Sequence, residues 1–115
     1  MTHKELEEYL LSFPNTWLDY PFGEDAAVYK IGHKETRDPP AGGKMFAIVG
    51  EKSDPVRISL KCDPQLAITL REKYESIVPG YHLNKKHWNT VICSGQLSQD
   101  EIFDLIRLSY NLVAD

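Results

Sequence analysis

Apolar side chains recur with a helical period near the start of the chain. They stand three or four residues apart, at Leu6, Tyr9, Leu10 and Phe13. This spacing predicts a helix with one buried face. Thr2 and Glu5 have the spacing of a capping box, so the helix is expected to begin there and to end before Pro14.

Two further helices are predicted along the chain. Residues 97–113 repeat the helical period, and Ser98 and Glu101 have the spacing of a second capping box. A middle helix is expected to start at Asp63 and Pro64, because Asp is a favoured N-cap and Pro fits the first helical turn.

The pattern between these helices favours strands. Runs rich in β-branched and aromatic residues, or with alternating apolar positions, cover residues 26–31, 44–49, 55–62 and 88–93. Residues 32–43 hold two prolines and three glycines and are expected to form a loop. The aromatic, turn-rich residues 16–25 are expected to form an ordered connection.

This order of elements predicts an α+β fold, a two-layer sandwich of the form α-β(3)-α-β(2)-α with an antiparallel sheet. Strands joined in series by short connections pair antiparallel, and helices then gather mainly on one face of the sheet. We therefore expect a single domain over residues 1–115. Arg57 and Lys61 should project from the open sheet face, since they alternate with the apolar positions of their strand.

Composition is that of a globular protein, with 42% hydrophobic and 26% charged residues. No apolar run approaches the roughly 18–20 residues that span a bilayer. The acidic N-terminus does not resemble a signal peptide, so a cytoplasmic protein without membrane association is expected. Cys62 and Cys93 form no CxxC pair and are expected to be buried thiols.

The net charge of −4 hides an uneven distribution of charge. Residues 26–93 carry eleven Lys and Arg against seven Asp and Glu, whereas both flanking segments are acidic. If the acidic segments are helices and the basic segment is the sheet, one surface is positive although the whole protein is negative.

The stretch GYHLNKKHWNTV, residues 80–91, concentrates the polar chemistry of the chain. It contains His82 and His87, but its spacing reveals no third group that would orient a catalytic base. The chain also lacks a nucleophile elbow, a phosphate loop and a dinucleotide fingerprint, so neither enzymatic activity nor a cofactor is expected. Adding His33 or Cys93 does not complete a recognisable metal-ligand spacing, so no metal site is expected.

A hairpin is the interpretation of this stretch that best suits nucleic-acid binding. Its arms would be residues 81–83 and 88–92, with Asn84 and two lysines at the tip. Lysines can reach phosphates, and Asn and His can donate to the backbone or to base edges. The same lysines could instead belong to a solvated turn that protects a sheet edge, and Trp88 could be a core anchor.

Several segments together resemble the MmcQ/YjbR family. These segments are YPFG (20–23), LKCDP (60–64), LR (70–71), PGYHLNKKHWNTV (79–91) and SYNLV (109–113). The resemblance implies the same α-β(3)-α-β(2)-α fold. It also implies a DNA-binding protein with a double-wing arrangement, whose two wings would correspond here to residues 80–91 and 32–44.

We therefore expect a non-enzymatic protein that binds double-stranded DNA mainly electrostatically. The lysines at the hairpin tip would contact phosphates, the asparagine and histidines would form hydrogen bonds, and the basic sheet residues would add long-range attraction. The predicted contact residues are Lys85, Lys86, Asn84, His87, His82, Arg57 and Lys61. The alternative is a module that binds a protein partner or a small ligand on the open sheet face, without a nucleic-acid role.

Overall fold

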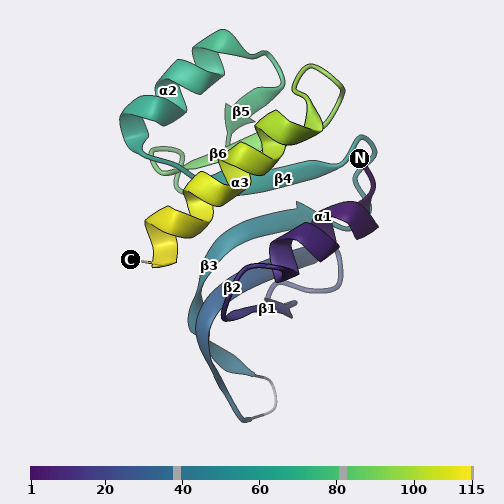
Figure 1. The fold of residues 1–115 in the computed structure, drawn as a ribbon, viewed down its shortest axis with the longest axis vertical. Coiled ribbons are helices and arrows are strands. Elements are labelled where there is room, and N and C mark those ends of the chain that lie inside the picture. Colours follow the sequence, from purple (N-terminus) through teal and green to yellow (C-terminus); the bar gives the residue numbers. More distant parts are fainter. Residues whose placement is uncertain (38–39, 81–82, 115) are drawn as a thin grey trace.

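The computed structural model describes residues 1–37, 40–80 and 83–114. Within these residues the helices are α1 (His3–Leu11), α2 (Pro64–Lys73) and α3 (Gln99–Ala114). The strands are β1 (Thr16–Asp19), β2 (Ala26–Glu35), β3 (Ala41–Gly50), β4 (Arg57–Lys61), β5 (Ile77–Pro79) and β6 (Trp88–Ile92). The strands form one antiparallel sheet in the order β1-β2-β3-β4-β6-β5, and the helices lie mainly over one face of it (Figure 1). The predicted α+β sandwich is confirmed.

The helices begin where their capping residues predict. Thr2 and Glu5 form a complete capping box at the start of α1. The Asp63 carboxylate accepts hydrogen bonds from the first backbone N–H groups of α2, at 3.1 and 3.2 Å. Ser98 and Glu101 exchange hydrogen bonds before α3, so all three helix starts are satisfied locally.

The hydrophobic core lies between the helices and one face of the sheet. Leu6 and Leu10 of α1 and Ile106 of α3 are fully buried against it. The sheet contributes a continuous set of apolar side chains, which includes Ala27, Tyr29, Phe46, Ala47, Val49, Ile58, Leu60, Ile77 and Val91. Each large side chain buried in this way stabilises the fold by about 1.5–3 kcal/mol before entropy is subtracted.

Two segments that were expected to lack strands contain them. Thr16–Asp19 pairs with β2 as an edge strand, and β2 and β3 extend to Glu35 and from Ala41 into the expected loop. In that hairpin Gly42 and Gly43 have positive φ angles of 92° and 71°. A Cβ on Gly42 would lie 2.5 Å from the His33 carbonyl oxygen. These glycines permit an irregular hairpin, with a register shift in the ladder, where composition alone predicts a loop.

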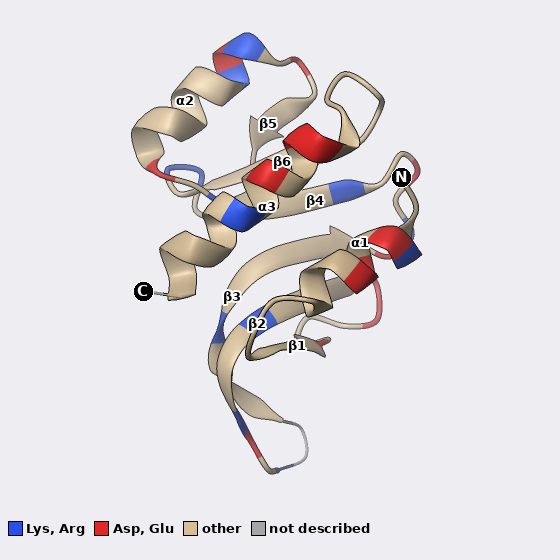
Figure 2. Cartoon of the chain, viewed as in Figure 1, with Lys and Arg blue, Asp and Glu red and all other residues tan. Residues whose placement is uncertain are grey.

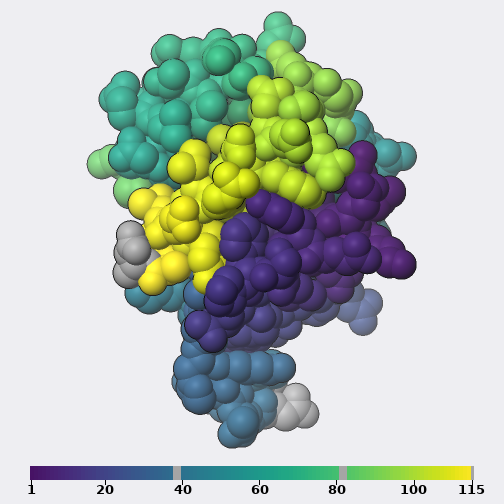
Figure 3. Space-filling model, in the orientation of Figure 1, coloured from purple at the N-terminus to yellow at the C-terminus, as the bar shows by residue number. Residues whose placement is uncertain are grey.

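Antiparallel pairing separates the strand connections into two groups at opposite ends of the sheet. One group, the hairpin end, comprises the β2–β3 hairpin beyond Ile31, the end of β4 at Lys61 and the turn 83–87. The other, the loop end, comprises the connections 20–25 and 51–56. The β2–β3 hairpin protrudes from the body of the protein (Figure 3), and the molecule including this hairpin measures 42 × 28 × 25 Å.

Candidate functional site

The hairpin end concentrates basic side chains. Its described cationic residues are Lys34, Arg37, Lys44, Lys61, Lys85 and Lys86. All of them are exposed except Lys61, which is half-buried. The acidic side chains described there are engaged locally, since Glu35 pairs with Arg37 at 3.1 Å and Asp63 caps α2. The hairpin end therefore carries a net positive charge.

Acidic residues lie elsewhere on the molecule. The loop end carries Glu24, Asp25, Glu51 and Asp54. Figure 2 shows further acidic positions on α1 and at the start of α3, and basic positions along the β2–β3 hairpin and in the turn beside α2. The predicted separation of charge is thus present. Basic residues gather at one end of the strands, and acidic residues lie at the other end and on the helices α1 and α3.

The turn 83–87 presents the two predicted lysines to solvent. The Asn84 side-chain oxygen accepts a hydrogen bond from the Lys86 backbone N–H at 2.9 Å, and its carbonyl accepts one from Trp88 N–H at 2.9 Å. Lys85 Nζ donates to the Gly80 carbonyl at 3.1 Å. Asn84 therefore has a structural role in the turn, and within the described residues no hydrogen bond or ion pair holds the Lys86 ammonium.

The one predicted histidine of this hairpin that the structure describes is less exposed than the lysines of the turn. His87 is half-buried, and its carbonyl accepts a hydrogen bond from Cys62 N–H at 2.7 Å. His82 lies outside the described residues. The first hairpin arm was expected at residues 81–83, of which 81 and 82 lie outside the described residues. In the described part of the chain, β6 pairs with Ile77–Pro79 on one side and with β4 on the other. The short polar run obscured the true arm, because a three-residue edge strand has too few positions to show alternation.

Two residues that the sequence did not single out hold this turn against α2. Arg71 Nη1 donates to the Lys85 carbonyl at 3.1 Å and to Asn89 Oδ1 at 2.8 Å. Asn89 is buried, and its Nδ2 donates to the Ala67 carbonyl at 3.2 Å. Both residues lie within or beside the quoted family segments, which was the signal that could have identified them.

Trp17 supports the base of the β2–β3 hairpin. Its Nε1–H donates to the Gly32 carbonyl at 3.0 Å, and the ammonium groups of Lys30 and Lys34 lie 5.0 and 5.4 Å from its ring centroid. Cations over an indole face are attracted by the ring quadrupole. Strand β1 therefore orders the part of the hairpin from which its basic residues project.

Lys30 is already paired. Its ammonium lies 2.9 Å from the Asp19 carboxylate, and both side chains are 12% exposed. Partial burial by itself raises the pKa of Asp19, but the hydrogen bond from Lys30 and that from the Tyr20 amide outweigh it. The pKa of Asp19 is therefore lowered, and this ion pair stabilises the sheet instead of offering a free cation.

Arg57 does not lie with the lysines of the hairpin end. It begins β4, whereas Lys61 ends it, and four residues of strand separate their backbones by about 13 Å. Arg57 lines a groove of the open sheet face with Ser59 and Thr90. Lys61 lies beside Leu112 and Val113 of α3 and not on the open face as predicted. The structure therefore brings Lys61 toward Lys85 and Lys86, and it places Arg57 beside a groove at the loop end.

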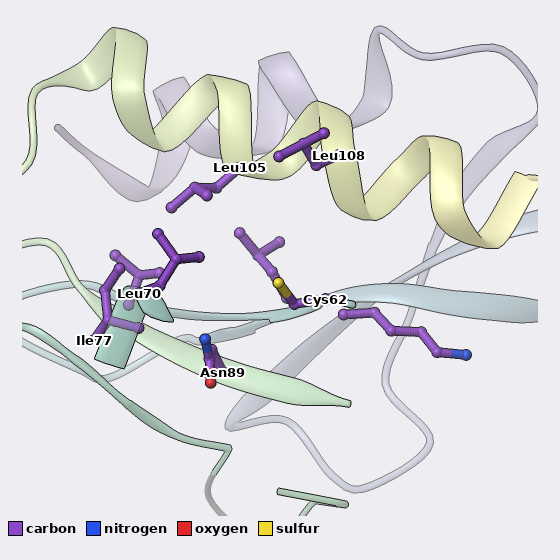
Figure 4. Close-up of a pocket in the computed structure, with 9 residues that line it drawn as sticks. Cys62, Leu70, Ile77, Asn89, Leu105 and Leu108 are labelled. Atoms are coloured by element: carbon purple, nitrogen blue, oxygen red, sulfur yellow. The ribbon is translucent and has the colours of Figure 1, made fainter. Parts of the chain in front are cut away.

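A small cavity lies between the sheet and the helices α2 and α3. Its volume is about 20 Å³, and Cys62, Leu70 and Leu105 are among the residues that line it (Figure 4). This volume suits about one water molecule. Burial raises the pKa values of the Cys62 and Cys93 thiols, which are free and half-buried.

Within residues 1–37, 40–80 and 83–114, no three His, Cys, Asp or Glu side chains come together as a metal site would require. In the same part of the chain, no helix is both long and apolar enough to cross a membrane.

Comparison with known proteins gives consistent likenesses. The sequence model of the YjbR family matches residues 11–112. The chain is 38% identical to the uncharacterised protein YbdF of Escherichia coli O157:H7 over 113 residues, which cover 98% of this chain and 84% of YbdF. It is 41% identical to the uncharacterised protein YjbR of E. coli strain K12 over 66 residues, which cover 57% and 56% of the two chains.

Solved structures share the fold. The crystal structure of the Deinococcus radiodurans protein DR2400 matches with a TM-score of 0.89 and 36% identity, over 99% of this chain and 79% of that protein. A crystal structure of a Pseudomonas syringae protein matches with a TM-score of 0.76 and 31% identity, over 98% and 99% of the two chains. These likenesses extend over nearly the whole chain and are not confined to one motif.

Proposed function

This chain belongs to the YjbR family, and from the topology and charge of its hairpin end we propose that it binds double-stranded DNA through the phosphate backbone. The proposed function is binding, without catalysis or a cofactor.

One observation carries the proposal: both hairpins leave the sheet at the same end, and each carries exposed lysines. The β2–β3 hairpin supplies Lys34 and Lys44, and the turn 83–87 supplies Lys85 and Lys86. Lys61 lies at the end of β4, between the two hairpins in the strand order. Two separated groups of cations can neutralise phosphates at two places along a duplex, which releases counterions and favours binding.

The charge on the rest of the molecule gives this binding an orientation. The acidic residues of α1, α3 and the loop end repel phosphates, so a duplex is attracted to the hairpin end and not to the helices. The contacts proposed are lysines to phosphates, which position a protein but do not read bases. We therefore expect weak sequence selectivity.

The test is fluorescence anisotropy of a labelled random-sequence duplex, titrated at about 50 and 200 mM salt. Two double variants remove the charges of one hairpin each, Lys34→Gln with Lys44→Gln and Lys85→Gln with Lys86→Gln. Each is expected to weaken binding severalfold at low salt. Each should also reduce the slope of log affinity against log salt by about 0.9 for every phosphate that the variant no longer neutralises.

The matched control is Lys52→Gln with Lys73→Gln. It changes the net charge equally but alters the loop end and the end of α2, so it is expected to retain nearly full affinity. Equal losses of affinity in the control and the hairpin variants would show a response to net charge alone and contradict the proposed surface. The absence of binding at about 50 mM salt would remove the DNA proposal altogether.

A further inference from the structure

The open sheet face carries a groove that the proposed DNA surface does not use. Its volume is about 490 Å³, within the range of roughly 300–1,000 Å³ typical of small-molecule sites. It is lined by Phe22, Ala26, Ile48, Gly50, Ser53, Arg57, Ser59, Leu83 and Thr90. We propose that this groove binds a small amphipathic anion, with an apolar ring or chain along the sheet and a carboxylate at Arg57.

Strand register explains why the sheet face has a groove at this place. Ile48, Ser59 and Thr90 come from three adjacent strands and lie side by side, because Ile48 pairs with Ser59 and Ser59 pairs with Thr90. The Ser59 and Thr90 hydroxyls lie 2.7 Å apart and are hydrogen-bonded to each other. Small side chains therefore form the middle of the groove, and their polar atoms are partly satisfied within the sheet.

Larger side chains form the rim. Phe22 is 65% exposed, the largest exposure among the large hydrophobic side chains described. It occupies the third position of a β-turn that starts at Tyr20, has Pro21 at its second position and closes with a 3.2 Å hydrogen bond from Gly23 N–H to the Tyr20 carbonyl. The turn holds Phe22 out of the core and beside the groove, where an apolar ligand would cover its ring.

Arg57 determines the charge of the ligand. Among the described residues that line the groove, it is the one that carries a charge, and it is exposed. Across the described residues, no carboxylate lies within 4.0 Å of its guanidinium. A planar guanidinium can bind a carboxylate through two parallel hydrogen bonds.

The acidic residues of the loop end do not satisfy Arg57. Asp25 pairs with Lys52 at 3.0 Å. Glu51 is exposed and is not among the residues that line the groove. Glu24 and Asp54 are exposed but do not line the groove. A ligand with one negatively charged group would therefore complement the positive charge of Arg57.

The test uses three naphthalene probes that differ in charge: 2-naphthoate, neutral 2-naphthamide and cationic 2-naphthylmethylamine. Each is titrated into the full chain labelled with ¹⁵N, and backbone amide shifts are followed by NMR. We expect 2-naphthoate to shift the amide signals of Ile48, Ser59 and Thr90. It should also bind about tenfold more tightly than 2-naphthamide, because only the carboxylate forms charge-assisted hydrogen bonds with Arg57.

Three variants separate charge from shape. Arg57→Gln should remove the preference for the acid and leave binding of the amide unchanged. Phe22→Ala should weaken both probes severalfold, and because Phe22 is exposed this change should not affect folding. Lys73→Gln on α2 removes one positive charge away from the groove and should bind both probes as the unaltered protein does.

Several outcomes would overturn the proposal. Equal or tighter binding of the amide or the amine would exclude an anion site at Arg57. Shifts located outside the groove, or none at about 1 mM probe, would exclude this occupant. Duplex DNA or a protein segment that shifts the same three amides in place of the probes would assign the groove to a macromolecule. The results of the three probe titrations do not depend on the DNA proposal, which concerns other residues.

Discussion

At the scale of single residues, the Ser109 hydroxyl bonds the backbone of two strands at the point where they separate. Ser109 is fully buried on α3; its Oγ donates to the Phe46 carbonyl at 2.6 Å and accepts from Lys61 N–H at 3.0 Å. Pairing between β3 and β4 ends at Ala47 and Leu60, so beyond these residues the two strands no longer bond to each other. One hydroxyl therefore joins the helix to both strands where they separate.

Removal of this hydroxyl should be costly. In Ser109→Ala the Phe46 carbonyl and the Lys61 N–H both lose their partner, and each unsatisfied buried group costs about 1–3 kcal/mol. We expect the free energy of unfolding in urea to fall by about 2–3 kcal/mol. Ser94→Ala, at an exposed serine, should change it by less than about 0.5 kcal/mol. A similarly small change for Ser109→Ala would mean that water replaces the hydroxyl.

The Asp19–Lys30 pair should make stability depend on pH. A lowered folded-state pKa contributes stability above the unfolded carboxyl pKa of about 3.9, and this contribution is lost as the pH falls through the folded value. Asp19→Asn should therefore be less stable than the unaltered protein at pH 6. The difference should shrink as the pH falls below about 4. The free energy of unfolding of both proteins can be measured by urea denaturation. A difference between them that stays constant from pH 6 to pH 2 would show that the charge of Asp19 does not contribute to stability.

At the scale of elements, α2 acts as the support of the turn 83–87. Arg71 spans from the helix to the Lys85 carbonyl and to Asn89 of β6, so the helix, the turn and the strand share one hydrogen-bonded contact. Without this support the turn would rely on its own Asn84 hydrogen bonds and on the Lys85–Gly80 contact. The position of both lysines in the proposed DNA surface therefore depends on a residue that contacts no DNA in the proposal.

Arg71→Gln should loosen the turn without unfolding the protein. We expect hydrogen exchange of the His87 and Trp88 amides, which donate to the Asn84 carbonyl, to become about tenfold faster. Lys73→Gln, on the same helix, should leave this exchange unchanged. If both variants exchange at the rate of the unaltered protein, the turn is held by its internal hydrogen bonds alone.

At the scale of the whole molecule, the sheet keeps two candidate sites apart. The basic side chains are grouped at the hairpin end, and Arg57 and Phe22 border the groove from the loop end. Only Leu83 of the turn contributes to the groove as well. A sheet with a buried core is stiff, so binding at one site is expected to leave the other almost unaltered.

This independence can be measured directly. The affinity for duplex DNA at about 50 mM salt should change by less than about twofold when 2-naphthoate saturates the protein, because sites without shared partners contribute additively. A larger change would imply that Leu83 or the turn transmits ligand binding to the lysines. In that case the Phe22→Ala variant should abolish the change, since it weakens the ligand but not the DNA surface.

The sequence by itself determined the helix starts, the class of fold and the exposed lysines of residues 84–86. These features depend on neighbours a few positions apart: a capping box spans three residues, and the helix and strand periods are visible within a short window. The sequence did not predict the β1 strand or the ends of β2 and β3, because these features leave no such local pattern. Edge pairing and positive-φ glycines give little local periodicity, so composition there resembles that of a loop.

Only the tertiary structure decided which of these residues act together. Strand order and register placed Lys61 with both hairpins, moved Arg57 to the groove, and set Ile48, Ser59 and Thr90 side by side. They also gave Ser109 and Arg71 hydrogen-bond partners that lie between 14 and 63 positions away in the chain. Contacts over such separations follow from how whole elements pack, and no local pattern of residues specifies them.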